Sequence, residues 1–164
     1  MKTVFLVGLL AFCGNASAQS YGDWSVGASD DGTIVTAETI NESGASFGLV
    51  CLTSDGDCMW SLDAQPDCEH GATYPIMANT DSGAYSLTMR CAKSGSVKLL
   101  VFTDFAPLEE IVTNSQGRVG FAIPMKDGQF RVVRFSMSGA HKAAKQASDI
   151  TASLHKSSTK DLNL

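Results

Sequence analysis

Four cysteines in the middle of the chain are the residues whose type and spacing most directly predict chemistry. Cys51, Cys58, Cys68 and Cys91 follow one another at intervals of seven, ten and twenty-three residues. Zinc sites are typically built on short paired spacings such as Cys-x-x-Cys, which this chain lacks, so we expect no metal. An even number of cysteines in an exported chain favours disulfides instead. The spacing therefore predicts two disulfides.

The apolar pattern around the first two of these cysteines favours one pairing. Alternating apolar residues end at Cys51 on one predicted strand and begin at Cys58 on the next. A four-residue loop at 53–56 places Cys51 directly opposite Cys58, whereas a two-residue turn at 55–56 places Cys51 opposite Trp60. We prefer the first arrangement, and the two other pairings stay open. The preferred bonds join Cys51 to Cys58 and Cys68 to Cys91.

The other residues that could do chemistry are better explained by turns and solvated surfaces. Asp55 and Asp57 flank a glycine, as calcium ligands do, but the run does not continue to the terminal glutamate of a calcium loop. Asp-Gly is common turn chemistry. No Gly-x-Ser-x-Gly element is present, and the histidines at 70, 141 and 155 have no evident partner. We predict no catalytic residue and no cofactor, and a chain that is not an enzyme.

Charge is divided unequally along the sequence. Residues 20–89 contain eleven acidic side chains and no lysine or arginine, whereas the chain from Arg90 onward has eleven basic and six acidic ones. The acidic half argues against nucleic acid as a partner. It favours a protein partner, in particular a basic one drawn in by the long-range field, and self-association between the two halves is the alternative.

The first residues predict export. Lys2 gives a short positive start, an apolar run follows, and Ala16-Ser17-Ala18 matches the small-residue pattern of a signal peptidase site. Residues 1–18 are therefore expected to be a signal peptide, with Gln19 as the first mature residue. Acylation of Cys13, as in a lipoprotein, is the alternative. No later stretch is apolar and long enough to predict stable membrane insertion, so we expect a periplasmic or secreted protein.

Period-two alternation dominates the mature chain and predicts a mainly β domain at 19–156. We predict strands at 24–28, 33–38, 47–51, 58–62, 85–91, 97–103, 119–124 and 129–137. A short helix is expected near Pro107, with Asp104 as its cap, and a longer one from Ser138 with alanines on its apolar stripe. The predicted fold is an antiparallel sandwich or barrel-like domain stapled by disulfides. Residues 157–164 are polar and are expected to be a disordered tail.

Two short tracts resemble known families. The sequence 21–26, Tyr-Gly-Asp-Trp-Ser-Val, and the sequence 134–140, Arg-Phe-Ser-Met-Ser-Gly-Ala, are similar to the ends of the invasion-associated locus B family of small exported bacterial proteins. That resemblance implies an exported β-rich protein without known catalysis. Ser82-Gly83-Ala84-Tyr85 is similar to the Ser-Gly-x-Tyr element with which periplasmic lysozyme inhibitors occupy the enzyme's cleft. It implies that Ser82, Gly83 and Tyr85 contact a partner.

These observations lead to three hypotheses about function. The first is an exported, non-catalytic protein that binds a protein or an envelope component, with Asp55 and Asp57 among its contact residues. The alternative is a periplasmic inhibitor of a cell-wall lytic enzyme, or an immunity protein for a secreted toxin. The third is a hydrolase whose site the sequence does not reveal.

Overall fold

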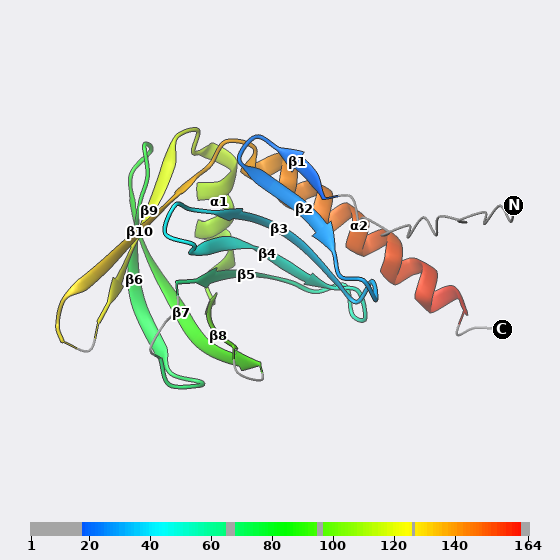
Figure 1. Ribbon diagram of the computed structural model, residues 1–164, viewed down its shortest axis with the longest axis horizontal. Helices are drawn as coiled ribbons and strands as arrows, with labels where there is room; N and C mark the ends of the chain where they lie inside the picture. The colour runs from blue at the N-terminus through cyan, green and yellow to red at the C-terminus, as the bar shows by residue number, and fades with distance from the viewer. Residues whose placement is uncertain (1–17, 65–67, 95–96, 126, 162–164) are drawn as a thin grey trace, which may run out of the picture.

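The computed structural model describes residues 18–161 apart from 65–67, 95–96 and 126 (Figure 1). Of the expected signal peptide, only Ala18 lies within the described residues, and Cys13 lies outside them. The mature domain predicted from Gln19 onward can be followed from the first strand to the last helix.

In the described part of the chain, ten strands form one sheet in which every neighbouring pair is antiparallel. The mainly β fold class is therefore confirmed. The strands are β1 (Gln19–Tyr21), β2 (Trp24–Ala28), β3 (Ile34–Ile40), β4 (Ser46–Leu52), β5 (Cys58–Asp63), β6 (Thr73–Asn79), β7 (Ala84–Ser94), β8 (Val97–Phe102), β9 (Arg118–Pro124) and β10 (Phe130–Ser136). Their order across the sheet is β1-β2-β3-β4-β5-β8-β7-β6-β9-β10.

The sheet curls until its last strand, β10, contacts β3 in its first half. Among the residues that the structure describes, no backbone ladder joins β10 to that half. Side chains make the connection instead: Trp24 Nε1 donates to Ser136 O at 2.8 Å, Asn41 Nδ2 to Arg134 O at 3.2 Å, and Arg131 Nη1 to Ala64 O at 2.6 Å. The architecture is thus barrel-like, with an incomplete seam beside β10.

Aromatic rings fill the space inside the curl. Phe47, on β4, is fully buried and has its ring centroid 5.4 Å from that of Trp60 and 5.0 Å from that of Phe121. Trp60 belongs to the first half of the sheet and Phe121 to the second, so one side chain joins both halves. Such large buried rings contribute more apolar area than any other residue type, which makes this cluster the centre of the core.

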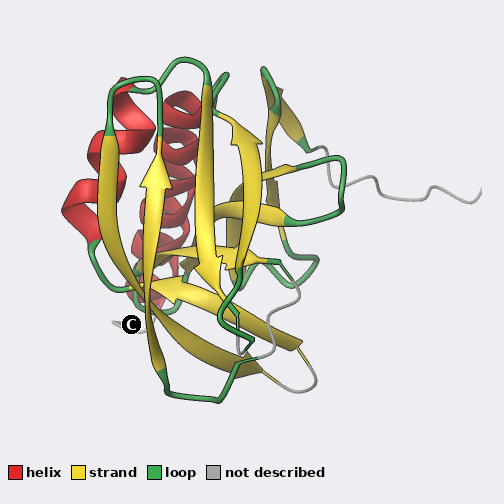
Figure 2. Cartoon of the chain, turned by 90° about the vertical axis from the view of Figure 1, so that its left-hand side faces the viewer, coloured by secondary structure: helices red, strands yellow, loops and turns green. Residues whose placement is uncertain are grey.

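Both helices lie on the same side of the molecule (Figure 2). The first, α1 (Phe105–Asn114), buries Leu108, Ile111 and Val112. Asp104 is its N-cap residue, as predicted, but the Asp104 carboxylate makes no capping bond and accepts the Thr88 N–H at 2.5 Å instead. Asp104 therefore ties the start of the helix to β7.

The second helix, α2 (Ala140–Asp161), packs on β2, β3 and β4. Ala140, Ala143 and Ala147 are buried, as the alanine stripe predicts, and their small side chains allow the helix to approach the sheet closely. The predicted boundary is wrong, because the helix runs through residues that we assigned to a disordered tail from Ser157. No glycine or proline interrupts this segment, so nothing in its backbone stops the helix.

Most predicted strands lie within a few residues of the observed ones, but β1 and β6 were missed. In β6 the inward residues Ile76 and Ala78 are buried, while the outward positions include Pro75 and an exposed methionine. The register that pairs Met77 with Ala122 would place Pro75 opposite Pro124. Because neither proline has an N–H, the ladder between β6 and β9 ends before this point.

Candidate binding surfaces

The covalent framework agrees with the preferred pairing. Cys51 bonds to Cys58 and Cys68 bonds to Cys91. Cys51 and Cys58 lie directly opposite each other in the register of β4 and β5, which confirms the four-residue loop at 53–56. The second disulfide ties the segment before β6 to the middle of β7.

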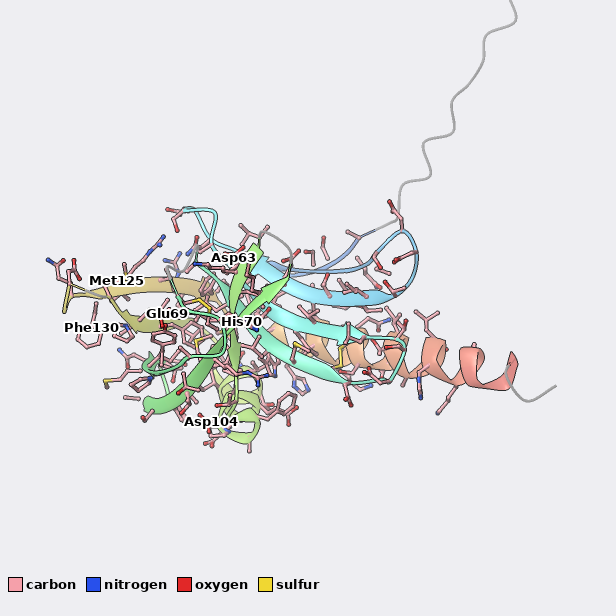
Figure 3. All side chains as sticks on the ribbon, turned by 90° about the horizontal axis from the view of Figure 1, so that it is seen from below. Asp63, Glu69, His70, Asp104, Met125 and Phe130 are labelled. Atoms are coloured by element: carbon pink, nitrogen blue, oxygen red, sulfur yellow. A yellow bond between two sulfur atoms is a disulfide. The ribbon has the colours of Figure 1, made fainter. Side chains whose placement is uncertain are left out.

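The three histidines lie in different parts of the fold. His70 is exposed, the His141 Nδ1 lies 3.5 Å from Thr113 Oγ1, and the His155 Nδ1 lies 3.1 Å from Thr53 O. Glu69 and His70 lie in the loop before β6, away from Asp104 beside α1 (Figure 3). Among the residues that the structure describes, no group of three or more histidine, cysteine, aspartate or glutamate side chains could hold a metal ion.

Two turns at one end of the sheet bring four exposed carboxylates together, the predicted Asp55 and Asp57 among them. Thr53, at the start of the β4–β5 turn, donates its backbone N–H to Thr33 O at 3.0 Å and its hydroxyl to Gly32 O at 3.0 Å, so this turn lies beside the β2–β3 turn (Figure 1). The two turns carry exposed acids, which we call the acidic tip: Asp30, Asp31, Asp55 and Asp57. Asp55 and Asp57 are thus where the sequence placed them, in an exposed turn.

Within the acidic tip, two carboxylates organise their own turns. Asp31 Oδ1 accepts hydrogen bonds from the Ser29 hydroxyl at 2.6 Å, the Thr33 hydroxyl at 2.8 Å and the Thr33 N–H at 3.1 Å. These bonds lower the pKa of Asp31 to about 2, and the bond from Ser29 makes the largest contribution. Asp55 Oδ1 accepts the Asp57 N–H at 3.2 Å. Asp31 and Asp55 therefore have local structural roles.

Other described acids of the first half, Asp81 and Asp23 among them, lie away from the acidic tip, so the acidic half does not form one surface. Asp81 accepts the Gln116 N–H at 3.3 Å beside the end of α1, and Asp23 accepts the Ser136 hydroxyl at 2.6 Å. The charge division along the sequence is therefore only partly a division in space.

The Ser-Gly-x-Tyr element occupies the β6–β7 turn. Ser82 and Gly83 are exposed, and the Ser82 hydroxyl lies 2.9 Å from Thr80 Oγ1, which also accepts the Ser82 and Gly83 N–H groups at 3.2 Å. Tyr85 is half-buried and packs against the core, as its inward position in the strand predicts. Ser82 and Gly83 are available at the surface, while most of Tyr85 faces the core.

Sequence reasoning missed a groove beside β10. A cavity of about 510 Å³ lies between the β3–β4 turn and β10, and Ile40, Val132 and Arg134 are among its lining residues. Ile40 is 63% exposed and Val132 is 48% exposed. We call this feature the β10 groove. The alternating pattern of β10 marks Val132 as outward, but only the topology shows that its strand is at the edge of the sheet.

The hydrogen-bond pattern shows which backbone groups face the β10 groove. Met137 N–H donates to Gly117 O and Met125 N–H donates to Gln129 O, so the odd-numbered residues of β10 bond to β9. The N–H and C=O groups of Val132, Arg134 and Ser136 consequently point away from β9. Arg134 O and Ser136 O receive the side-chain bonds from Asn41 and Trp24.

Comparisons with known proteins support the fold and leave the function open. No protein-family model matches the chain, and no curated protein matches it in sequence. The fold is similar to that of invasion associated protein B from Bartonella henselae, with a TM-score of 0.55, 13% sequence identity, and coverage of 85% of this chain and 99% of that one. This similarity agrees, at the level of the fold, with the resemblance at the two ends of the chain.

The two disulfides fit a protein that folds outside the cytoplasm, because such bonds form and persist in oxidising compartments. Among the described residues, no helix has both the length and the hydropathy that crossing a membrane requires.

Proposed function

We propose that the chain is an exported binding protein, periplasmic or secreted, that captures a basic protein or envelope component through the acidic tip. The observation that carries this proposal is the convergence of four exposed carboxylates from two turns that hydrogen-bond to each other. Their field would raise the association rate of a positively charged partner. Kinship with invasion associated protein B, beyond the common fold, is part of the same proposal.

The test is charge reversal at the tip. Asp30→Lys with Asp57→Lys is the appropriate variant, because Asp31 and Asp55 hold their own turns. Pull-down from envelope extract identifies the partner, and its association rate is then measured at about 0.01 M and 0.1 M salt, where the Debye length falls from about 30 Å to about 10 Å. We expect salt to slow association with the native protein at least several-fold, and reversal to slow it at low salt.

A matched control variant changes the net charge by the same amount at a site away from the acidic tip. Glu109→Lys with Glu110→Lys alters two exposed acids on α1 by the same amount. This control should keep most of the native association rate. Equal rates for the tip variant, the control and the native protein, or rates independent of salt, would contradict the proposal.

The exposed turn at Ser82 and Gly83 favours a second candidate, a periplasmic inhibitor of a cell-wall lytic enzyme or an immunity protein for a secreted toxin. The folded, oxidised protein should then inhibit at least one member of a panel of basic lysozymes. Ser82→Ala removes the hydroxyl that would enter the cleft, and Ser86→Ala removes a second exposed hydroxyl of the same hairpin as a control. Absence of inhibition eliminates this candidate for the enzymes tested.

A further inference from the structure

We propose that the outer edge of β10 is a docking site for an extended peptide that adds to the sheet as a further strand and carries carboxylate side chains on one face. This interaction is independent of the acidic tip, which the proposed function uses for a basic partner. The two surfaces would therefore recognise chemically opposite ligands.

The first argument is the unused backbone of β10. Val132 directs both its N–H and its C=O away from β9, and Arg134 directs its N–H the same way. Among the described residues, no hydrogen bond takes up these three groups. Arg134 O and Ser136 O are already occupied by Asn41 and Trp24, so the open positions lie between the Asn41 bond to Arg134 and the bond from Arg131 to Ala64 O. A peptide strand supplies the donors and acceptors that such an edge lacks.

The second argument is the shape beside that edge. The β3–β4 turn lines the β10 groove opposite β10, and Ile40 at the end of β3 and Val132 from β10 expose apolar side chains to it. A natural edge strand is normally covered or blocked, because an open edge pairs with other chains. Here the cavity of about 510 Å³ leaves space along the edge, and its apolar residues can contact alternate side chains of an added strand.

The third argument is charge. Arg118 and Arg134 are exposed on the same face of the β9–β10 hairpin, and neither forms an ion pair with another described residue. The Arg134 side chain lies beside Gly120 of β9, where a Cβ would be 3.6 Å from Arg134 Cγ, an ordinary van der Waals contact. An added strand on β10 would place alternate side chains beside Arg134. Carboxylates at those positions complement the guanidinium groups.

The opposite wall and the edge itself narrow the choice of ligand. Asp23 and Glu42 also line the groove, and Asp23 accepts the Ser136 hydroxyl of β10, so a peptide that is acidic on both faces is disfavoured. A second copy of this chain, paired edge to edge, would bring its own Arg131 and Arg134 beside those of the first. Like charges on adjacent strands repel, so the charges favour a peptide over a second copy.

The probe for the experiment is a fluorescent peptide of sequence Thr-Glu-Val-Glu-Val-Glu-Thr, blocked at both ends, whose glutamates share one face when it is extended. Fluorescence anisotropy with the full mature protein should give saturable binding. The same peptide with N-methyl groups on the residues that face β10 should bind at least tenfold more weakly, because it lacks the backbone donors. A peptide with lysine in place of glutamate should lose binding to a similar degree.

Variants of the protein locate the site. Val132→Pro removes one outward N–H, a change that an edge strand tolerates, and it should abolish binding. Val132→Thr keeps the N–H and should bind like the native protein. If Val132→Pro does not fold, as judged by far-UV circular dichroism, Arg134→Glu serves as the second variant and should weaken binding at least tenfold.

Three outcomes would overturn the proposal. Equal binding of the native and N-methylated peptides would show that the edge backbone is not used. Absence of binding at millimolar concentrations of the glutamate peptide would show that the groove does not accept this chemistry. Dimerisation that is seen by ultracentrifugation and is lost in Val132→Pro would make a second copy the occupant.

Unchanged peptide binding in the acidic-tip variant would show that the two surfaces are separate.

Discussion

Gly139 shows how a single residue position limits the fold. Its φ is +90°, and a Cβ there would lie against the carbonyl oxygen of Tyr21, far closer than two atoms can approach. The residue stands directly before α2, where the chain passes the first strand. Only glycine satisfies both the left-handed backbone and the close approach.

We therefore expect Gly139→Ala to lower the free energy of unfolding by about 2 kcal/mol or more, through backbone strain and steric clash. Urea denaturation measures this loss. Gly27→Ala is the control, because its new methyl group would have no heavy atom within 4 Å. That control should leave stability unchanged or raise it by up to about 1 kcal/mol. Equal stability of the two variants would contradict the assignment.

Asp31 gives a prediction about pH. Its folded pKa of about 2 lies below the ordinary value of 3.8, so its ionised form favours folding above that value, and the contribution is lost as pH falls from about 3.8 through about 2. Titration of the Asp31 side chain by NMR should show the low midpoint. Ser29→Ala removes the largest cause and should move the midpoint upward, towards 3.8, whereas Ser43→Ala, in a different turn, should not.

The candidate surfaces differ in how far residue types alone predict them. Asp-Gly chemistry correctly placed Asp55 and Asp57 in a turn, because that preference is local. The contact between this turn and the β2–β3 turn depends on strand pairing and was not predictable from either segment. Ile40 and Val132 are ordinary strand residues in the sequence. The groove between them exists only because the sheet curls and because β10 is the edge strand of the sheet.

At the scale of elements, the disulfides can be compared by the lengths of chain they close. Cys68–Cys91 spans 23 residues, and Cys51–Cys58 spans seven within one hairpin. In the chain-entropy model, the longer loop is worth about 3 kcal/mol and the shorter one somewhat less. Cys68–Cys91 also ties the loop before β6 to β7, whereas β4 and β5 are already paired along their strands.

Replacing both cysteines of the longer loop by alanine should accordingly destabilise the domain by about 3 kcal/mol, more than the same change at Cys51 and Cys58. The midpoints of urea denaturation under non-reducing conditions give the comparison. Peptide mapping of the native protein should first recover the two observed bonds. A larger loss from the hairpin disulfide would show that loop closure does not determine the order.

Elements were predictable where their pattern was regular. The alternation in β7 and the alanine spacing in α2 are sufficient to predict both elements. β6 was missed because Pro75 and an outward methionine interrupt its alternation. Pairing with β7 on one side and β9 on the other makes this segment a strand despite its weak pattern. β1 has only three residues, and it is held in place by contacts with β2 and α2. A local sequence pattern cannot predict such contacts.

The whole molecule should unfold as one unit, because Phe47 contacts rings from both halves of the curled sheet and both helices pack on the same core. Tryptophan fluorescence reports on Trp24 and Trp60 in the first half, while far-UV circular dichroism reports on all strands and helices. Their urea curves should coincide when the disulfides are intact. Two separated transitions would show that the halves are independent.

The bond from Trp24 to Ser136 has a consequence for the order in which the structure is completed. A chain that emerges from a ribosome or a translocation channel begins with its N-terminus, so the indole N–H of Trp24 is outside while its acceptor, 112 residues later, is still inside. Both disulfides join cysteines that emerge within 23 residues of each other. The covalent links can therefore form on the emerging chain, whereas the first strands wait, with a core tryptophan accessible to chaperones, until the last strand arrives.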